Sequence, residues 1–236
     1  MNMAYEILKP DQVTKAPIRG VLFDMDGLVL NSEILYSRFW REAAACFGYT
    51  MSYEQSLKMR ALNTQLGTDM IHSFFGENAD YHTIRNMRIK LMDAYITQNG
   101  VDVKPGIFEL LAYLQAKGIR TAITSASPLP RILSHLSRHG LDVAFDQLCS
   151  GHDMPNGKPA PDIYLHGAKV LGLNPEECLA LEDAPAGILS AYRAGCLPVM
   201  IPDLDQPNEE TKALLYAKAE SLLDIIDIIE KQKGHQ

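Results

Sequence analysis

The sequence of 236 residues predicts an α/β fold in which a parallel sheet is covered by helices on both faces. The first observation is a short apolar run, Val21 to Phe23, with the length and composition of a fully buried strand. The second is an alternation of strand and helix patterns from residue 104 onward. The third is a stretch after the first strand, residues 32–100, that shows helical spacing and no strand-like run.

The sequence predicts three regions along the chain. Residues 1–17 are mixed in character and contain two prolines, so we expect an N-terminal extension there. The α/β core domain is expected to comprise residues 18–31 and 101–236. Apolar residues recur at helical spacing in the intervening residues 32–100, which therefore predict a domain of several helices inserted into the core.

The rest of the chain predicts the remaining elements of the core. Further strands are expected at residues 121–124, 145–149, 178–181 and 197–201. Helices are expected at residues 107–117, 130–139, 161–171, 186–194, 209–216 and 222–231. Glycine follows several of these helices, as is typical at a helix C-terminus. The order of elements predicts a Rossmann-like parallel sheet sandwiched by helices.

Composition and charge narrow the class of protein. The net charge of −7 argues against a nucleic-acid-binding protein, which would carry a basic surface. No apolar run approaches the length of a membrane span, and the N-terminus lacks the pattern of a signal peptide. The four cysteines are far apart in sequence, which fits buried thiols in a reducing compartment. We therefore expect a cytoplasmic protein with no nucleic-acid or membrane partner.

Two carboxylates follow the first predicted strand directly. Asp24 and Asp26 are separated only by Met25, so their side chains share one face of an extended chain. Charge is costly in an apolar interior, and ligands of open parallel sheets bind at the C-terminal edge of the strands. These aspartates predict an acidic metal or phosphate site there. The alternative interpretation is an aspartate-rich turn, because Asp26-Gly27 is a common turn former.

Other polar groups are expected at the same edge of the sheet. Hydroxyls follow the strand at 121–124, Glu182-Asp183 follows the strand at 178–181, and Lys158 precedes the helix at 161–171. Taken singly, the serines and acids could cap helices and the lysine could be solvated. Their joint occurrence favours carboxylates around a hard cation such as Mg²⁺, with lysine and hydroxyls forming a cradle for a phosphoryl group.

The order of motifs DMDG, TSAS, GKPAPD and EDAPAG resembles that of the haloacid dehalogenase superfamily of phosphohydrolases. The resemblance extends from about Arg19 to the last predicted helix. The helical insert after DMDG resembles the small helical cap of the β-phosphoglucomutase-like branch. Within this branch, the chain looks nearest to small-molecule phosphatases such as pseudouridine-5'-phosphatase.

The resemblance implies catalytic roles for Asp24, Asp26, Ser125 and Lys158, and a phosphate-binding role for Ala126. Asp24 would be the nucleophile that forms an aspartyl-phosphate, and Asp26 would act as general acid and then as general base. Ser125 and the backbone N–H of Ala126 would hold the oxygens of the phosphoryl group. Lys158 would neutralise negative charge between the nucleophile and the phosphate.

The resemblance also implies a Mg²⁺ site. Its ligands would be the side chains of Asp24 and Asp183 and the backbone carbonyl of Asp26. Glu182 would bind the ion directly or through a water molecule. The substrate partner would be a small phosphorylated metabolite, and the protein would be a monomer or a small homo-oligomer.

The implied activity is Mg²⁺-dependent hydrolysis of a phosphate monoester, either a sugar phosphate or a nucleotide-like compound. Two alternatives stay open: a sugar-phosphate mutase of the β-phosphoglucomutase type, and a phospho-receiver-like signalling or binding module. Tyr36 stands where the mutase carries a histidine that its phosphoryl shuttling uses, which favours hydrolysis. A general acid such as Asp26 and a helical insert are features that a receiver does not need.

Residues of the insert near its beginning are candidates for substrate contacts. The resemblance suggests four such residues, namely Asn31, Tyr36, Arg60 and Asn63. The simpler interpretation is that Tyr36 and Arg60 pack within the insert or lie in solvent.

Overall fold

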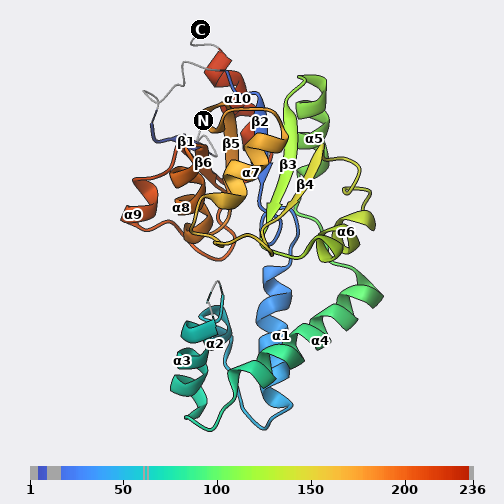
Figure 1. The fold of residues 1–236 in the computed structure, drawn as a ribbon, viewed down its shortest axis with the longest axis vertical. Coiled ribbons are helices and arrows are strands. Elements are labelled where there is room, and N and C mark those ends of the chain that lie inside the picture. The colour runs from blue at the N-terminus through green and yellow to red at the C-terminus, as the bar shows by residue number, and fades with distance from the viewer. Residues whose placement is uncertain (1–4, 10–16, 61, 63, 234–236) are drawn as a thin grey trace. The chain divides into compact units, whose positions relative to one another are not determined.

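The structure is a computed structural model that describes residues 5–9, 17–60, 62 and 64–233 (Figure 1). Contacts divide the chain into two compact units, residues 1–30 with 103–236 and residues 31–102. We call them the core unit and the helical unit. Asn63, one of the candidates for substrate contact, lies outside the described residues.

The core unit contains one sheet with the strand order β1-β7-β6-β5-β2-β3-β4. All neighbouring strands run parallel except β1, which is antiparallel to β7. The expected parallel sheet is therefore confirmed, and five strands match the predicted ones to within two residues at each end. The strands are β1 (Tyr5–Ile7), β2 (Gly20–Phe23), β3 (Arg120–Ser125), β4 (Gln147–Ser150), β5 (Cys178–Glu182), β6 (Leu197–Met200) and β7 (Ala217–Ala219).

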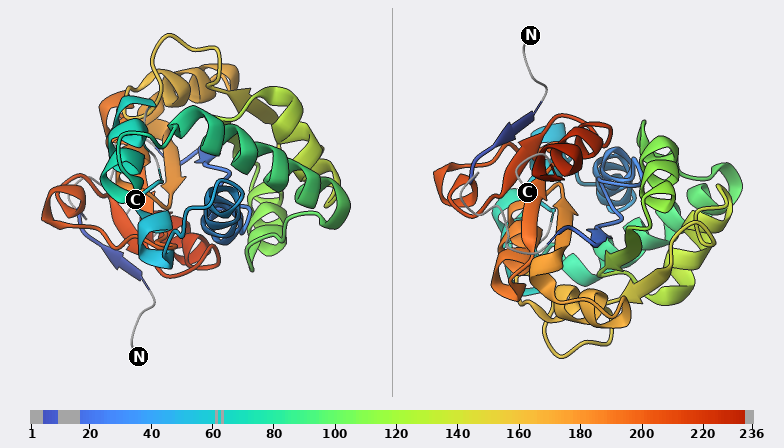
Figure 2. Two further views of the ribbon diagram at one scale, coloured as in Figure 1. Left: turned by 90° about the horizontal axis from the view of Figure 1, so that it is seen from below. Right: turned by 90° about the horizontal axis from the view of Figure 1, so that it is seen from above.

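Helices cover both faces of this sheet. Helix α7 packs on β2, β3 and β4 and α8 packs on β5 and β6, whereas α5 packs on β3 and α10. Figure 2 shows α7 and α10 on opposite sides of the sheet. The helices of the core unit are α5 (Ile107–Ala116), α6 (Leu129–Ser137), α7 (Asp162–Val170), α8 (Pro185–Ala194), α9 (Glu209–Lys212) and α10 (Asp224–Lys233), with a 3₁₀ turn at Pro175–Glu177.

Strand β2 lies in the middle of the sheet, and its four residues are buried. Leu22 of β2 belongs to the apolar core that α7 and α8 form over the sheet, as does Tyr164 of α7. Gly167 allows α7 to approach closely, because a Cβ atom there would lie 2.8 Å from Thr124 Cγ2 and 3.1 Å from Leu22 Cδ2. This close packing brings α7 against the strands that carry the polar residues of the predicted site.

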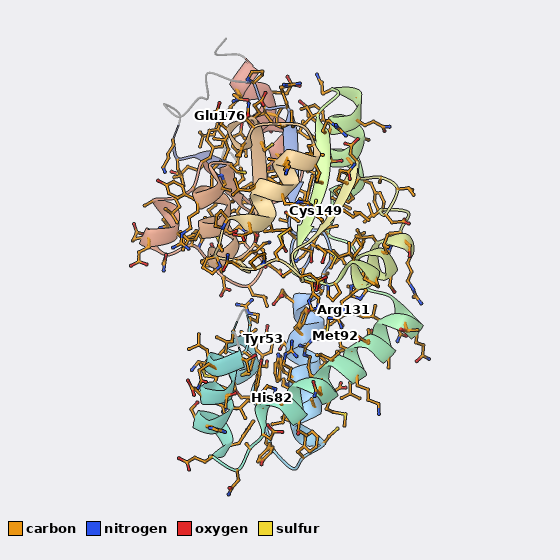
Figure 3. All side chains as sticks on the ribbon, in the orientation of Figure 1. Tyr53, His82, Met92, Arg131, Cys149 and Glu176 are labelled. Atoms are coloured by element: carbon orange, nitrogen blue, oxygen red, sulfur yellow. The ribbon has the colours of Figure 1, made fainter. Side chains whose placement is uncertain are left out.

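The ends of the parallel strands can be followed in Figure 3. Glu176 lies in the turn just before β5 begins, and Cys149 lies near the end of β4, so the two labels mark opposite ends of the strands. The residues of the predicted site lie at the C-terminal ends of the parallel strands, the end that Cys149 marks.

Three details of the core unit differ from the sequence prediction. Strand β1 lies within the segment interpreted as an N-terminal extension, and β7 follows a helix that ends at Lys212 rather than at Tyr216. Strand β4 begins at Gln147, two residues later than expected, and Phe145 precedes it with its ring packed edge-on against Phe23 at 5.3 Å between ring centroids. Strands of three residues without an apolar run, such as β7, are too short for residue periodicity to reveal.

The helical unit contains α1 (Glu33–Ala45), α2 (Tyr53–Leu57), α3 (Thr64–Phe75) and α4 (Tyr81–Asn99). Ser52 forms a capping box with Gln55 at the start of α2, and the carboxylate of Asp80 accepts the N–H groups that begin α4. Trp40 of α1 and Ile71 of α3 are among the buried residues of its core. The helical spacing read from the sequence is thus explained by an apolar core of this unit.

The four cysteines are free thiols. Three are buried as expected, but Cys46 is exposed because it follows the last turn of α1 at the surface. Within the described ranges, no helix combines the length and the apolar composition needed to cross a membrane.

Candidate active site

A tight turn places the two aspartates after β2. The backbone N–H of Asp24 donates to the carbonyl of Leu181 at 3.0 Å, which continues the pairing of β2 with β5. Gly27 has a φ of +83°, and its N–H donates to the carbonyl of Leu30 at 2.9 Å. Asp24 is buried, with 9% of its surface exposed, and Asp26 is half-buried. The turn therefore keeps both carboxylates at the C-terminal edge of the sheet.

Lys158 joins the ends of three neighbouring strands. Its Nζ atom donates to Asp24 Oδ1 at 2.5 Å, to Glu182 Oε1 at 2.5 Å and to the carbonyl oxygen of Thr124 at 3.2 Å. These acceptors belong to the ends of β2, β5 and β3, and an ammonium group has three protons to donate. The side chain of Lys158 is therefore fixed at the centre of the strand ends.

Helix α8 holds the loop that carries Lys158. The hydroxyl of Ser190 donates to the carbonyl of Ala160 at 2.5 Å, and the guanidinium of Arg193 donates to the carbonyl of Pro159 at 3.1 Å. Ser190 and Arg193 are three residues apart and so lie on the same side of the helix. The helix that begins just after Glu182 and Asp183 thus also fixes the position of the lysine.

Three buried carboxylates form a cluster beside the lysine. Asp24, Glu182 and Asp183 each offer an oxygen, and these oxygens lie within 4.8 Å of one another. Burial raises the pKa of Asp24 and raises the pKa of Glu182 to about 7, although the Lys158 ammonium opposes both effects. One ammonium cannot balance three carboxylates, so the cluster fits an additional hard cation bound through oxygen atoms.

Ser125, the last residue of β3, and Ser127 in the following loop are linked to Asp26. Ser125 is buried, and its hydroxyl oxygen accepts the backbone N–H of Ser127 at 3.1 Å. The hydroxyl of Ser127 donates to Asp26 Oδ2 at 3.5 Å. Ala126, between the two serines, is exposed. The structure therefore links this loop to Asp26, and the roles of Ser125 and Ala126 toward phosphate stay predictions.

Two of the candidates for substrate contact, Tyr36 and Arg60, have partners within the helical unit. The ring of Tyr36 lies 4.9 Å from the guanidinium carbon of Arg88. The guanidinium of Arg60 lies 3.8 Å from the carboxylate of Glu33. Asn31 is the first residue of the unit. These contacts agree with a packing role for Tyr36 and Arg60, and contact with a substrate stays a prediction.

Two residues of the site have no counterpart in the sequence prediction, and both contact Glu182. The hydroxyl of Tyr164 donates to Glu182 Oε1. Gly187 lies in the first turn of α8, where a Cβ atom would overlap the carboxylate of Glu182. Gly187 is the last residue of the EDAPAG motif, but the sequence assigns it no role toward Glu182, and a tyrosine in a predicted helix offers no pattern that would connect it with an acidic residue.

A Rossmann-like sheet that ends in this aspartate, lysine and acidic cluster defines a class of hydrolases. The chain belongs to the haloacid dehalogenase-like hydrolase family, whose sequence model matches residues 18–195. This result confirms the family resemblance identified from the motifs.

Several relatives of the chain carry the name phosphatase. Hexitol phosphatase A of Escherichia coli K12 is 34% identical over 178 residues, which cover 75% of this chain and 80% of the relative. The Saccharomyces cerevisiae protein named "Probable pseudouridine-5'-phosphatase" is 30% identical over 234 residues, covering 92% and 96%. The crystal structure of CbbY from Rhodobacter sphaeroides in complex with phosphate has a TM-score of 0.71 and 25% identity, covering 88% and 96%. The chain is therefore an enzyme, a phosphatase of this family.

Gly187→Ala is expected to lower kcat/KM for phosphate release by about 10- to 100-fold, the usual cost of disturbing groups around a metal site. The added Cβ atom displaces the Glu182 carboxylate and loosens its pairing with Lys158. Steady-state kinetics with a phosphate ester measure this change. Gly157→Ala is the control, because a Cβ atom at Gly157 has no neighbour within 4 Å. Wild-type kcat/KM in both variants would show that displacing the Glu182 carboxylate does not affect phosphate release.

Proposed function

We propose that this enzyme hydrolyses a small phosphate monoester of a sugar, a polyol or a nucleoside-like compound, with Asp24 as nucleophile. The observation that carries the proposal is the position of Lys158, whose Nζ atom lies 2.5 Å from both Asp24 Oδ1 and Glu182 Oε1. A cation held against a strand-end carboxylate can stabilise a transferring phosphoryl group. The hexitol phosphatase and the yeast relative support a small ester as substrate.

In the first half of the reaction, Asp24 attacks phosphorus and forms a bond to it while the bond from phosphorus to the ester oxygen breaks. Asp26 donates its proton to the departing alcohol oxygen. In the second half, Asp26 takes a proton from water, the water oxygen attacks phosphorus, and phosphate leaves Asp24. Lys158 balances negative charge in both halves, and Ser125 and the N–H of Ala126 hold phosphoryl oxygens.

Magnesium is the cofactor in this proposal, and the three carboxylate oxygens that lie within 4.8 Å of one another fit such an ion. Asp24, Asp183 and the backbone carbonyl of Asp26 would hold it, with Glu182 as a direct or water-mediated ligand. When bound, Mg²⁺ supplies positive charge that stabilises the oxygens of the transferring phosphoryl group.

In this proposal, residues 32–100 act as a cap domain on a core domain of residues 18–31 and 101–236. Asn31, Tyr36, Arg60 and Asn63 would contribute to substrate selection. The enzyme would act in the cytoplasm on a phosphorylated metabolite, as a monomer or small homo-oligomer. Free thiols at all four cysteines support a reducing compartment.

The test is phosphate release from a panel of esters that includes hexitol phosphates, sugar monophosphates and pseudouridine 5'-phosphate. With Mg²⁺, at least one ester is expected to give many turnovers per enzyme. Chelation is expected to lower the rate at least about 100-fold, and added Mg²⁺ to restore it, because unbalanced carboxylates repel the phosphoryl group.

Other outcomes of this panel would contradict hydrolysis. Uptake of a single phosphoryl group without further turnover would indicate a phospho-receiver. Conversion of one sugar phosphate into an isomer without phosphate release would indicate a mutase.

A further inference from the structure

Tyr164 is a buried phenol inside the catalytic cluster, and none of the steps described above uses it. None of its surface is exposed, and its ring belongs to the apolar core under α7. Its hydroxyl donates to Glu182 Oε1, and its ring centroid lies 5.1 Å from Lys158 Nζ. Tyr164 therefore contacts both members of the Lys158–Glu182 pair.

The two hydrogen bonds to Glu182 end on the same atom. Lys158 Nζ and the Tyr164 hydroxyl both donate to Oε1, and neither donates to Oε2. Gly187 lies against the carboxylate from α8, leaving no space for a side-chain atom. Two donors on one oxygen and close packing on another side fix the rotation of the carboxylate. Oε2 is thereby left for another partner.

We propose that Tyr164 is a positioning residue, which orients Glu182 so that Oε1 holds Lys158 and Oε2 serves the bound cation. The proposal rests on the proposed function, since it concerns the same site. Loss of a hydrogen-bonding partner that orients a metal-binding carboxylate commonly lowers metal affinity or activity by about 10- to 100-fold. The aromatic ring alone would leave Lys158 as the one hydrogen-bond donor to Oε1 of these two, so the rotation of the Glu182 carboxylate would be less restricted.

The test is Tyr164→Phe, which removes the hydroxyl and keeps the ring with its packing. Calorimetric titration with Mg²⁺, without any ester, is expected to show affinity lowered about 10-fold. In kinetics with the best ester, the Mg²⁺ concentration for half-maximal rate is expected to rise about 10-fold, while KM for the ester changes less than about twofold. The matched control is Tyr192→Phe, because Tyr192 is an exposed tyrosine on the neighbouring helix α8.

Unchanged Mg²⁺ affinity in Tyr164→Phe would overturn the proposal, whatever happens to the melting temperature, because a merely structural hydroxyl affects stability alone. The metal titration also separates this proposal from the proposed function. If the wild type hydrolyses no ester but Tyr164→Phe still weakens Mg²⁺ binding, the positioning role stands and the assigned activity fails.

Discussion

Asp24→Asn is expected to lower the rate of phosphate release by at least about 10⁴-fold, since removing a nucleophile typically has an effect of this size or larger. The amide carries no charge and attacks phosphorus poorly. It also removes one of the two carboxylates that share the Lys158 ammonium. The measurement is multiple-turnover phosphate release with saturating Mg²⁺ and the best ester of the panel.

Asp227→Asn is the matched control for this variant, because Asp227 is an exposed aspartate on α10. Intact mass should be checked before each assay, since deamidation of the new asparagine regenerates the aspartate. Thermal unfolding should show that the variant is folded. If more than a tenth of the wild-type rate remains in a folded, undeamidated sample, Asp24 is not the nucleophile.

The central strands of the sheet could be predicted because burial on both faces leaves a clear pattern. Val21 to Phe23 form a continuous apolar run, and all of β2 is buried. Strand β7, with the residues Ala217-Lys218-Ala219, carries no such run and gains its place only by pairing between β6 and β1. Short strands of this kind depend on tertiary contacts that a local pattern does not contain.

The acidic part of the candidate site could be predicted because of where its residues occur. Asp24 and Glu182 lie at the ends of predicted parallel strands, and such ends meet at one edge of a sheet. Tyr164 could not be predicted, because an aromatic residue on the buried side of a helix is most often part of the core. It is indeed part of that core, and only the three-dimensional packing of α7 brings its hydroxyl to Glu182.

Lys158 has an electrostatic role within the protein itself, in addition to the positive charge that it offers to the substrate. Its ammonium provides positive charge for Asp24 and Glu182, and it opposes the rise that burial causes in the pKa of both carboxyl groups. Burial also disfavours the charged lysine, but the two carboxylates outweigh this effect and raise its pKa well above its usual value. We therefore expect the stability of the metal-free enzyme to depend on Lys158, and turnover to depend on the metal and the lysine together.

Lys158→Met is expected to lower kcat by about 10³-fold or more, because a preorganised charge on the transferring group is lost. Lys158→Arg is expected to rescue little, since a planar guanidinium cannot serve three acceptors arranged around one ammonium. The exposed Lys169 of α7 provides the control variant Lys169→Met. A kcat within tenfold of wild type for Lys158→Met would exclude a catalytic role.

The stability of Lys158→Met without metal is expected to depend on pH more steeply than that of the wild type. Burial already raises the pKa of Glu182 to about 7, so the folded state binds more protons than the unfolded state between about pH 4.5 and 7. Stability from this group is therefore present at low pH and lost as pH rises. Without the ammonium, the pKa rises further and the loss becomes larger, up to about 3–5 kcal/mol for an uncompensated buried charge. Thermal unfolding in chelator should show a larger deficit relative to wild type at pH 8 than at pH 5; a deficit independent of pH would mean that Lys158 contributes packing and no charge compensation.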